Sequence, residues 1–346
     1  MGIYIQAAST ISPQKNSGQE PDYSLLIDPK SIRRMSRIIR MGVGAAAACL
    51  RDAGITCPDA IVTGTAYGCL ADTGIFLSKM ITQLEEMLPP TAFIQSTHNT
   101  VGGQIALLFQ CHGYNNTFVH RGFSFESALL DAMLLLKEGE GRDPQDEAGD
   151  PQDEAGETQV RHAELSNVLV GAADEITEFS HAILSRFGLY RNTRAGEGAA
   201  FFLLTNRTAG ASARLEGLDT FYKPKDAEEI EDRVRSFLNS RSVAVGDLDL
   251  VIMGNNGDHA SDGIYEKLSS SVFSGCARIR YKDICGEYPT SASFALWLAT
   301  DIVKMGIVPA GIRCEGKKKD KLRKILIYNH YQGIYHSLML VSGLKE

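Results

Sequence analysis

The sequence lacks any apolar stretch approaching the roughly 18 to 20 residues that cross a bilayer, so a membrane-spanning protein is not expected. Met1–Pro13 also lacks a basic region followed by an apolar core, the arrangement typical of a secretory signal peptide. We therefore expect a cytoplasmic location.

Motifs for metals, disulfides and nucleotides are absent as well. The seven cysteines are odd in number and scattered without a CxxC pair, which favours reduced core thiols over a disulfide framework or a metal site. The sequence contains no GxxxxGKS phosphate loop, no GxSxG elbow, no HExxH and no GxGxxG after a strand. No cofactor and no metal are predicted.

Positive charge is also scarce, since the chain carries a formal charge of -7 and an isoelectric point near 5.7. Nucleic-acid binding normally requires a basic face that neutralises phosphates, so no nucleic-acid partner is expected. The 346 residues are 44% hydrophobic and 22% charged, values close to those of globular proteins. These numbers predict a folded, soluble protein with a sizeable core.

Short apolar runs alternate with amphipathic stretches, the pattern of an α/β protein whose sheets are covered on both faces. The expected strands are 3–7, 59–65, 117–120, 167–172, 199–204, 248–253, 325–328 and 337–341. The expected helices are 32–52, 74–86, 102–109, 126–137, 227–238 and 291–304.

One segment departs from this composition. Between residues 138 and 160 the chain turns to Gly, Asp, Glu, Gln and Pro, and the heptapeptide DPQDEAG occurs twice in tandem. Such a sequence cannot bury enough apolar surface to hold one shape, so we interpret 138–160 as a mobile acidic surface insert without site residues.

Four longer segments carry the main functional signal. They are RRMSRIIRMGVGAAAACLRDAGI, PTAFIQSTHNTVGGQIALLFQCHG, NVLVGAADEIT, and RNTRAGEGAAFFLL with Gly196, Glu197, Gly198 and Ala199. In this order they resemble the β-ketoacyl synthases of the thiolase-like superfamily. The resemblance implies an α/β thiolase-like fold of five αβαβα layers, made of two similar βαβαβαββ halves. It places the N-terminal half at residues 1–206 and the C-terminal half at 207–346.

The family condenses an acyl chain with malonyl units on acyl carrier protein, using one cysteine and two histidines. Aligning VHRGFSFESALLDAMLLLKEG with the nucleophile segment places Gly122 where the cysteine belongs. LDLVIMGNNGDHASDG places Gly254 at the first histidine, and YKDICGEYPTSASFALWLA keeps Lys282 and Gly286 but has Glu287 at the second. A missing acid or base costs about 10² to 10⁴ in rate, so the resemblance implies a degenerate member without condensing activity.

Two residues could form a rebuilt site. Ser124 lies two positions after Gly122, and His259 lies five positions after Gly254. A displaced Ser/His pair is therefore one interpretation, although Ser124 as a helix N-cap and His259 as a loop residue are simpler. Lys282 and Glu287 are expected to form an ion pair, and all these positions except His259 are expected to cluster.

The leading functional hypothesis is a chain-length-factor-like subunit of a bacterial type II fatty-acid or polyketide system, such as an aryl-polyene system. The chain would form a homodimer, or a heterodimer with an active ketosynthase, and would meet acyl carrier protein. One alternative is an acyltransferase or 3-oxoacyl-[acyl-carrier-protein] synthase with a relocated nucleophile. Another is a non-catalytic homodimer that binds a fatty acid or acyl carrier protein.

Overall fold

The computed structural model describes residues 2–13, 18–138, 165–190, 192–317 and 319–344. Its strands are β1 (Ile3–Ile11), β2 (Ala60–Gly64), β3 (Tyr114–Phe118), β4 (Asn167–Asp174), β5 (Gly198–Thr205), β6 (Ala213–Tyr222), β7 (Leu250–Met253), β8 (Arg278–Arg280), β9 (Cys314–Glu315), β10 (Lys324–Tyr331) and β11 (Tyr335–Ser342). Its α-helices are α1 (Pro29–Ile32), α2 (Arg37–Ala53), α3 (Leu70–Thr82), α4 (Pro90–Gln95), α5 (Thr100–Phe109), α6 (Ser124–Glu138), α7 (Glu178–Arg186), α8 (Ala227–Asn239), α9 (His259–Ser270), α10 (Lys282–Cys285) and α11 (Ala292–Met305). Short 3₁₀ turns are η1 (Tyr23–Leu25), η2 (Arg121–Phe123) and η3 (Val245–Asp247).

The strands follow the order β3-β2-β4-β5-β1-β6-β11-β10-β7-β8-β9. Both halves have the same strand order when the strands of each are numbered from its own first strand and the two-residue β9 is left out. Read from the edge of the sheet to its centre, this order is third, second, fourth, fifth, first. The first strands of the two halves, β1 and β6, pair with each other over Ile3–Ile5 and Ala213–Leu215. The halves are therefore related by internal symmetry and joined into one sheet that bends around its centre.

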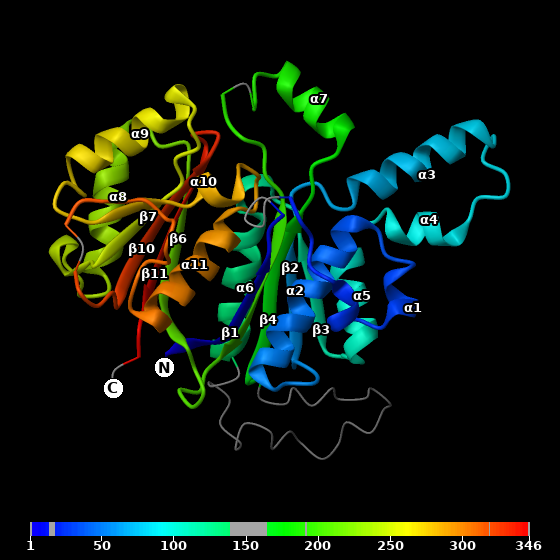
Figure 1. The fold of residues 1–346 in the computed structure, drawn as a ribbon, viewed down its shortest axis with the longest axis horizontal. Helices are drawn as coiled ribbons and strands as arrows, with labels where there is room; N and C mark the ends of the chain where they lie inside the picture. The colour runs from blue at the N-terminus through cyan, green and yellow to red at the C-terminus, as the bar shows by residue number, and fades with distance from the viewer. Residues whose placement is uncertain (1, 14–17, 139–164, 191, 318, 345–346) are drawn as a thin grey trace, which may run out of the picture.

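Three hydrophobic clusters separate five layers (Figure 1). Helices α2 and α5 cover the outer face of the N-terminal strands, while α8 and α9 cover the outer face of the C-terminal strands. Helices α6 and α11 lie between the two groups of strands and contact both. This confirms the predicted α/β fold with two similar halves and five αβαβα layers.

The central helices are apolar because they are covered on both sides. Helix α11 buries Phe294, Leu298 and Ile302, and α6 buries Phe125 and Leu129, all with essentially no exposed surface. Burial of such side chains contributes about 1.5 to 3 kcal/mol each, so this layer contributes substantially to the stability of the fold.

Several elements differ from the sequence expectation. The helix expected at 32–52 is divided into α1 and α2, and the strand expected at 117–120 lies at Tyr114–Phe118. Strands β6, β8 and β9 and helices α4, α7, α9 and α10 were not predicted. In β6 the polar residues Arg214, Glu216 and Thr220 fall on the face that is not buried, so the strand lacks a continuous apolar run.

The boundary expected between residues 206 and 207 stays a proposal; it falls in the connection between β5 and β6. Of the acidic insert at 138–160, Glu138 ends α6, and the remainder lies outside the described residues.

Candidate functional site

The candidate site lies where the central strands of the C-terminal half end. Gly254 follows β7 directly, and its N–H donates to the carbonyl of Tyr328 in the parallel neighbour β10 at 3.2 Å. Strand β10 then continues through Asn329, His330 and Tyr331. In α/β sheets, crevices at the carboxyl ends of adjacent parallel strands are the usual ligand sites. The topology thus places residues 254 and 329–331 together.

Gly122 lies in η2, immediately before α6, and its surroundings are filled. A Cβ atom at this position would lie 2.8 Å from the Cβ of Tyr331 and 2.9 Å from the Cβ of Tyr335. These two atoms are fixed to the backbones of β10 and β11, so they cannot rotate away. Glycine is therefore required here by packing, and the space for a cysteine side chain is occupied by the two tyrosines.

Gly254 is equally enclosed. A Cβ atom there would lie 2.4 Å from the Oδ1 of Asn329 and 2.5 Å from the hydroxyl of Tyr265. The Tyr265 hydroxyl accepts a hydrogen bond from the N–H of His330, which holds it in this position. A histidine at residue 254 would force the ends of both hydrogen-bonded side chains to move.

Glu287 and Lys282 form the buried ion pair expected from the sequence. Lys282 Nζ lies 2.8 Å from Glu287 Oε2, and the two side chains are 1% and 8% exposed. Lys282 Nζ also donates to the carbonyl of His330 at 3.2 Å, and Asn256 Nδ2 donates to Glu287 Oε2 at 2.7 Å. Glu287 Oε1 is buried and has no hydrogen-bond partner among the described residues. Because both charges are buried, each depends on the other for compensation.

These contacts bring the predicted positions together around residues 329–331 of β10. Gly122 packs on Tyr331, Gly254 packs on Asn329, and Lys282 binds the carbonyl of His330. The expected clustering of these positions with Glu287 is therefore confirmed.

Ser124 is fully buried, and both hydrogen-bonding functions of its hydroxyl are used. It accepts from the N–H of His120 at 2.8 Å and donates to the carbonyl of Arg121 at 2.9 Å. The expectation that Ser124 is the N-cap of α6 is wrong, because η2 leads directly into α6 and Ser124 is its first residue. These two hydrogen bonds occupy the Ser124 hydroxyl, which would have to react if Ser124 were a rebuilt nucleophile.

His259 is the exposed first residue of α9. Within the described part of the chain, no hydrogen bond joins it to Ser124. The expectation that His259 lies in a loop is wrong, because His259 is the first residue of α9.

The remaining candidate nucleophiles and bases near the site are held neutral. Burial raises the pKa of the Cys285 thiol well above its ordinary value, which suppresses the reactive thiolate. Burial, and then Lys282, lower the pKa of His330 well below its ordinary value. His330 places Nε2 3.1 Å from the carbonyl of Ser261 and accepts from the N–H of Gly333 through Nδ1, as a neutral imidazole does.

All seven cysteines, which lie within the described residues, are free thiols. Five are buried, whereas Cys57 is exposed and Cys314 is partly exposed, so the description as core thiols holds for five.

A cavity of about 300 Å³ opens beside the ion pair. Its walls combine polar, aromatic and aliphatic residues from four segments: Gly188, Leu189, Tyr190, Asn192, Thr193, Asn256, Asp258, Ser261, Glu287, Tyr331, Gln332 and Ile334. Of these, only Glu287 belongs to the positions identified from the sequence. The sequence analysis did not identify the tyrosines that fill the site. The one signal available for them was the segment NHYQGIYHS, which differs from the Gly-Phe-Gly-Gly turn of the β-ketoacyl synthases.

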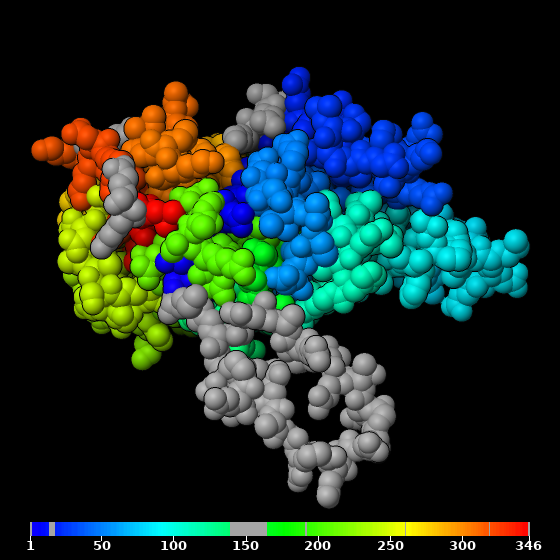
Figure 2. Space-filling model, turned by 90° about the horizontal axis from the view of Figure 1, so that it is seen from below, coloured from blue at the N-terminus to red at the C-terminus, as the bar shows by residue number. Residues whose placement is uncertain are grey.

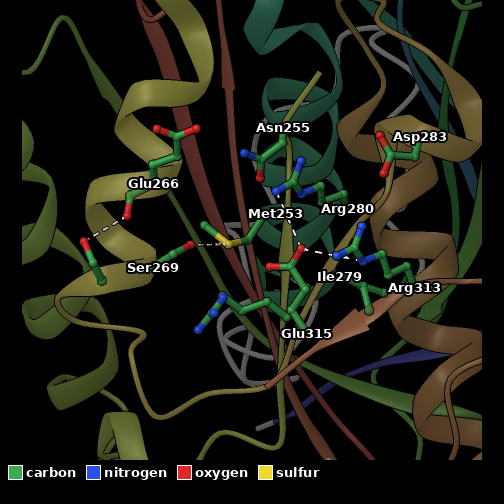
Figure 3. Close-up of a pocket in the computed structure, with 11 residues that line it drawn as sticks. Met253, Asn255, Glu266, Ser269, Ile279, Arg280, Asp283, Arg313 and Glu315 are labelled. Carbon is green, nitrogen blue, oxygen red and sulfur yellow. Dashed lines mark hydrogen bonds and ion pairs between the residues drawn. The ribbon is translucent and has the colours of Figure 1, made fainter. Parts of the chain in front are cut away.

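A second cavity, of about 340 Å³, is lined by residues of β7, β8, α9, α10 and β9 (Figure 3). Arg280 and Arg313 are both directed at the carboxylate of Glu315, with separations of 3.6 and 4.0 Å. Its lining holds three arginines and three carboxylates, so the charges of this cavity balance one another.

Groups of three or more His, Cys, Asp or Glu side chains that could hold a metal ion are absent from the described residues. Of the helices in the described ranges, none is long and apolar enough to cross a membrane.

Residues 7–142 match the family model described as the β-ketoacyl synthase N-terminal domain. This part of the chain is similar to the β-ketoacyl synthases. The matched segment runs from β1 through α6 and includes Gly122 at the expected nucleophile position.

Several solved structures share this fold over 99% of the chain. "The ishigamide ketosynthase/chain length factor" superposes with a TM-score of 0.75 at 16% identity, covering 99% of both chains. A β-ketoacyl synthase from Burkholderia phymatum STM815 gives 0.70 at 13% identity, covering 99% of this chain and 100% of that one. AntDE:AntF, a type II polyketide acyl-carrier protein in complex with its ketosynthase bound to the hexaketide, gives 0.72 at 14% identity, covering 99% of each chain. At these identities the likeness concerns the fold, and no curated protein matches the sequence.

Proposed function

We propose that this chain is a non-catalytic ketosynthase-like subunit that pairs with an active ketosynthase in a bacterial type II fatty-acid or polyketide system, as a chain-length factor does. The observation that carries the proposal is the filled site: Gly122 and Gly254 stand at the expected cysteine and first histidine, and tyrosines occupy the space around both. Aryl-polyene systems are among the systems that the proposal includes.

The chemistry supports an inert subunit. Condensation needs a thiolate that accepts the acyl group and donors that stabilise the enolate oxygen. Glu287 at the second histidine position is an acceptor that would repel both the malonyl carboxylate and the enolate. Each missing donor or base costs about 10² to 10⁴ in rate, so losing three leaves no useful turnover.

A partner requires a surface, and the edge of the sheet supplies one. Strand β3 pairs only with β2 within the described sheet, and α5 and α6 flank it. Large apolar side chains are exposed on these three elements and just after β3: Leu107, Tyr114, Val119, Leu130 and Leu134. An exposed edge strand with apolar neighbours is a surface that a second subunit commonly covers.

The helices α3 and α4 form a second apolar feature. They project from one end of the molecule (Figures 1 and 2). They and the turn between them expose Ile75, Leu77, Ile81, Leu84, Met87, Phe93 and Ile94 to between 50 and 95%. An arm of this kind is suited to packing against a partner subunit.

Acyl carrier protein is proposed as the second partner. Among the structural relatives, AntDE:AntF is a ketosynthase solved together with such a carrier. A cytoplasmic location is consistent with both proposed partners.

The test uses co-expression of this chain with a cysteine-bearing ketosynthase encoded beside it. We expect a stable 1:1 complex by native mass spectrometry, and no transfer of radiolabel from acyl carrier protein to this chain alone. A Leu134→Glu substitution at the β3 edge should break the complex, whereas Met305→Glu, at a similarly exposed residue of α11, should leave it intact. Equal binding by both variants would contradict the edge as the interface.

Two outcomes would favour the other functions. Covalent acylation of the pure chain that is lost in Ser124→Ala would indicate a relocated nucleophile. A homodimer that ignores the ketosynthase but retains acyl carrier protein or a fatty acid would indicate a binding protein.

A further inference from the structure

Two cysteines meet beside the edge strand β3. Cys57 lies in the connection between α2 and β2, and Cys111 lies in the connection between α5 and β3. Their sulfur atoms share one acceptor, since Cys57 Sγ lies 3.5 Å and Cys111 Sγ 3.1 Å from the carbonyl oxygen of Pro58. The two thiols also hydrogen-bond to each other. Two thiols that are distant in the sequence are therefore in contact in the folded chain.

The register of the strands accounts for this contact. Strands β2 and β3 are parallel neighbours with Ala60 opposite Tyr114, and each cysteine stands three residues before the first residue of its strand. The two segments stay adjacent outside the ladder, because a Cβ atom on Gly113 would collide with the carbonyl oxygen of Asp59. Adjacent strands lie about 4.8 Å apart, and a disulfide spans Cα separations of about 4.4 to 6.8 Å. A bond between the two sulfur atoms thus needs little movement of the backbone.

The two thiols differ in their access to solvent. Cys57 is exposed, whereas Cys111 is only 7% exposed. Burial raises the pKa of the Cys111 thiol, so its reactive thiolate is suppressed. A dissolved oxidant therefore reacts first with Cys57, and Cys111 is placed to act second, as a resolving cysteine does.

A metal site explains the pair less well. Zinc bound by thiolates takes three or four protein ligands. The described residues hold no group of three or more His, Cys, Asp or Glu side chains suited to a metal ion. Two thiols without such further ligands favour covalent chemistry over metal binding.

We propose that Cys57 and Cys111 form a reversible disulfide when the chain meets a hydroperoxide. The Cys57 thiolate attacks one oxygen of hydrogen peroxide: an S–O bond forms, the O–O bond breaks, and the leaving hydroxide takes up the proton that Cys57 had released. The Cys111 sulfur then attacks the sulfur of the Cys57 sulfenic acid. The S–S bond forms, the S–O bond breaks, and the Cys111 proton leaves with the hydroxide as water. In total, two thiols and one peroxide give one disulfide and two waters, and the peroxide takes the two electrons that the sulfur atoms lose.

The disulfide restricts a large part of the N-terminal half. The loop that it closes, residues 57–111, contains α3, α4 and α5. A cross-link over so long a loop lowers the entropy of the unfolded chain and so stabilises the folded one. The proposal is independent of the partner function, since both thiols belong to one chain and the test needs no ketosynthase.

The test treats the reduced, purified full chain with hydrogen peroxide, alkylates the remaining thiols in denaturant, and maps them by mass spectrometry of tryptic peptides. We expect the free thiols to fall from seven to five, with peptide 52–79 linked to peptide 80–121, and dithiothreitol to restore all seven. Fragmentation assigns the bond to Cys57, because Cys69 lies in the same peptide. A bond to Cys69, a disulfide between two chains, an oxidised Cys57 beside a free Cys111, or seven unchanged thiols would each overturn the proposal.

Variants separate this pair from the other thiols. Cys57→Ser should leave Cys111 free after peroxide treatment. Cys314→Ser is the matched control and should form the disulfide as the parent chain does, because Cys314 is partly exposed and its thiol contacts the carbonyl of Glu315. The oxidised parent chain should unfold at a higher urea concentration than the reduced chain, and Cys57→Ser should show no such shift. A lower midpoint after oxidation would mean that the bond distorts the folded chain, which contradicts the spacing of β2 and β3.

Discussion

Substitution of Gly122 by alanine tests whether the site has been filled. The new methyl group would lie 2.8 and 2.9 Å from the Cβ atoms of Tyr331 and Tyr335, distances that real Cβ atoms do not tolerate. Because both neighbours are anchored to strands, the start of α6 or the β10–β11 hairpin must shift. Overpacking of this kind costs roughly 1 to 3 kcal/mol, and we expect Gly122→Ala to lose that much free energy of unfolding.

Urea denaturation followed by circular dichroism measures this loss as a lower midpoint with an unchanged slope. The control is Gly103→Ala, since Gly103 lies in α5, is exposed, and has nothing within 4 Å of the position that a new methyl group would occupy. That variant should gain about 0.5 to 1 kcal/mol from helix propensity. If Gly122→Ala were as stable as the parent, the tyrosines would not fill the site and the argument for an inert subunit would lose its structural basis.

Three further results are expected. The triple variant Gly122→Cys/Gly254→His/Glu287→His should show no condensation of an acyl group with malonyl-loaded acyl carrier protein in a radiolabel assay. The reason is that the Cβ of residue 254 would lie 2.4 Å from the Oδ1 of Asn329. Measurable product would contradict this expectation. Lys282→Met should destabilise the chain by about 3 to 5 kcal/mol by leaving Glu287 buried and unpaired, and Lys282→Met/Glu287→Gln should recover most of the loss in urea melts. Burial raises the pKa of Glu126 from 4.5 to about 7, so the folded chain holds this proton more tightly than the unfolded chain. Stability from this group is present below pH 4.5 and is lost as the pH rises to about 7. Glu126→Gln should therefore reduce the difference between the unfolding free energies at pH 5 and pH 8. An unchanged difference would show that Glu126 does not cause it.

Local patterns were sufficient to predict most of the fold. The buried strands β2, β4, β5 and β10 are continuous apolar runs, and α6, α8 and α11 show clear helical periodicity, so each was predicted within a few residues. Elements with weaker patterns were missed. Helix α9 contains Ser, Asp and Gly in its sequence HASDGIYEKLSS, and β8 and β9 are only three and two residues long.

The sequence by itself determined the residue types at the positions where the resemblance predicts a cysteine and two histidines. Gly122, Gly254 and Glu287 can be identified from aligned segments, and the Lys282–Glu287 pair follows from their short separation in the chain. These inferences depend on residue type and local spacing, which the sequence states directly.

Only the tertiary structure decided which side chains surround these positions. Tyr331 and Tyr335 reach Gly122 from a hairpin in the other half of the chain, and Tyr190 joins them from a third segment. The strand order of the sheet brings these segments together. No local sequence pattern predicts which distant side chains will line the same cavity. The sequence therefore predicted the residue types at these positions, and the packing of the two halves determined which distant side chains surround them.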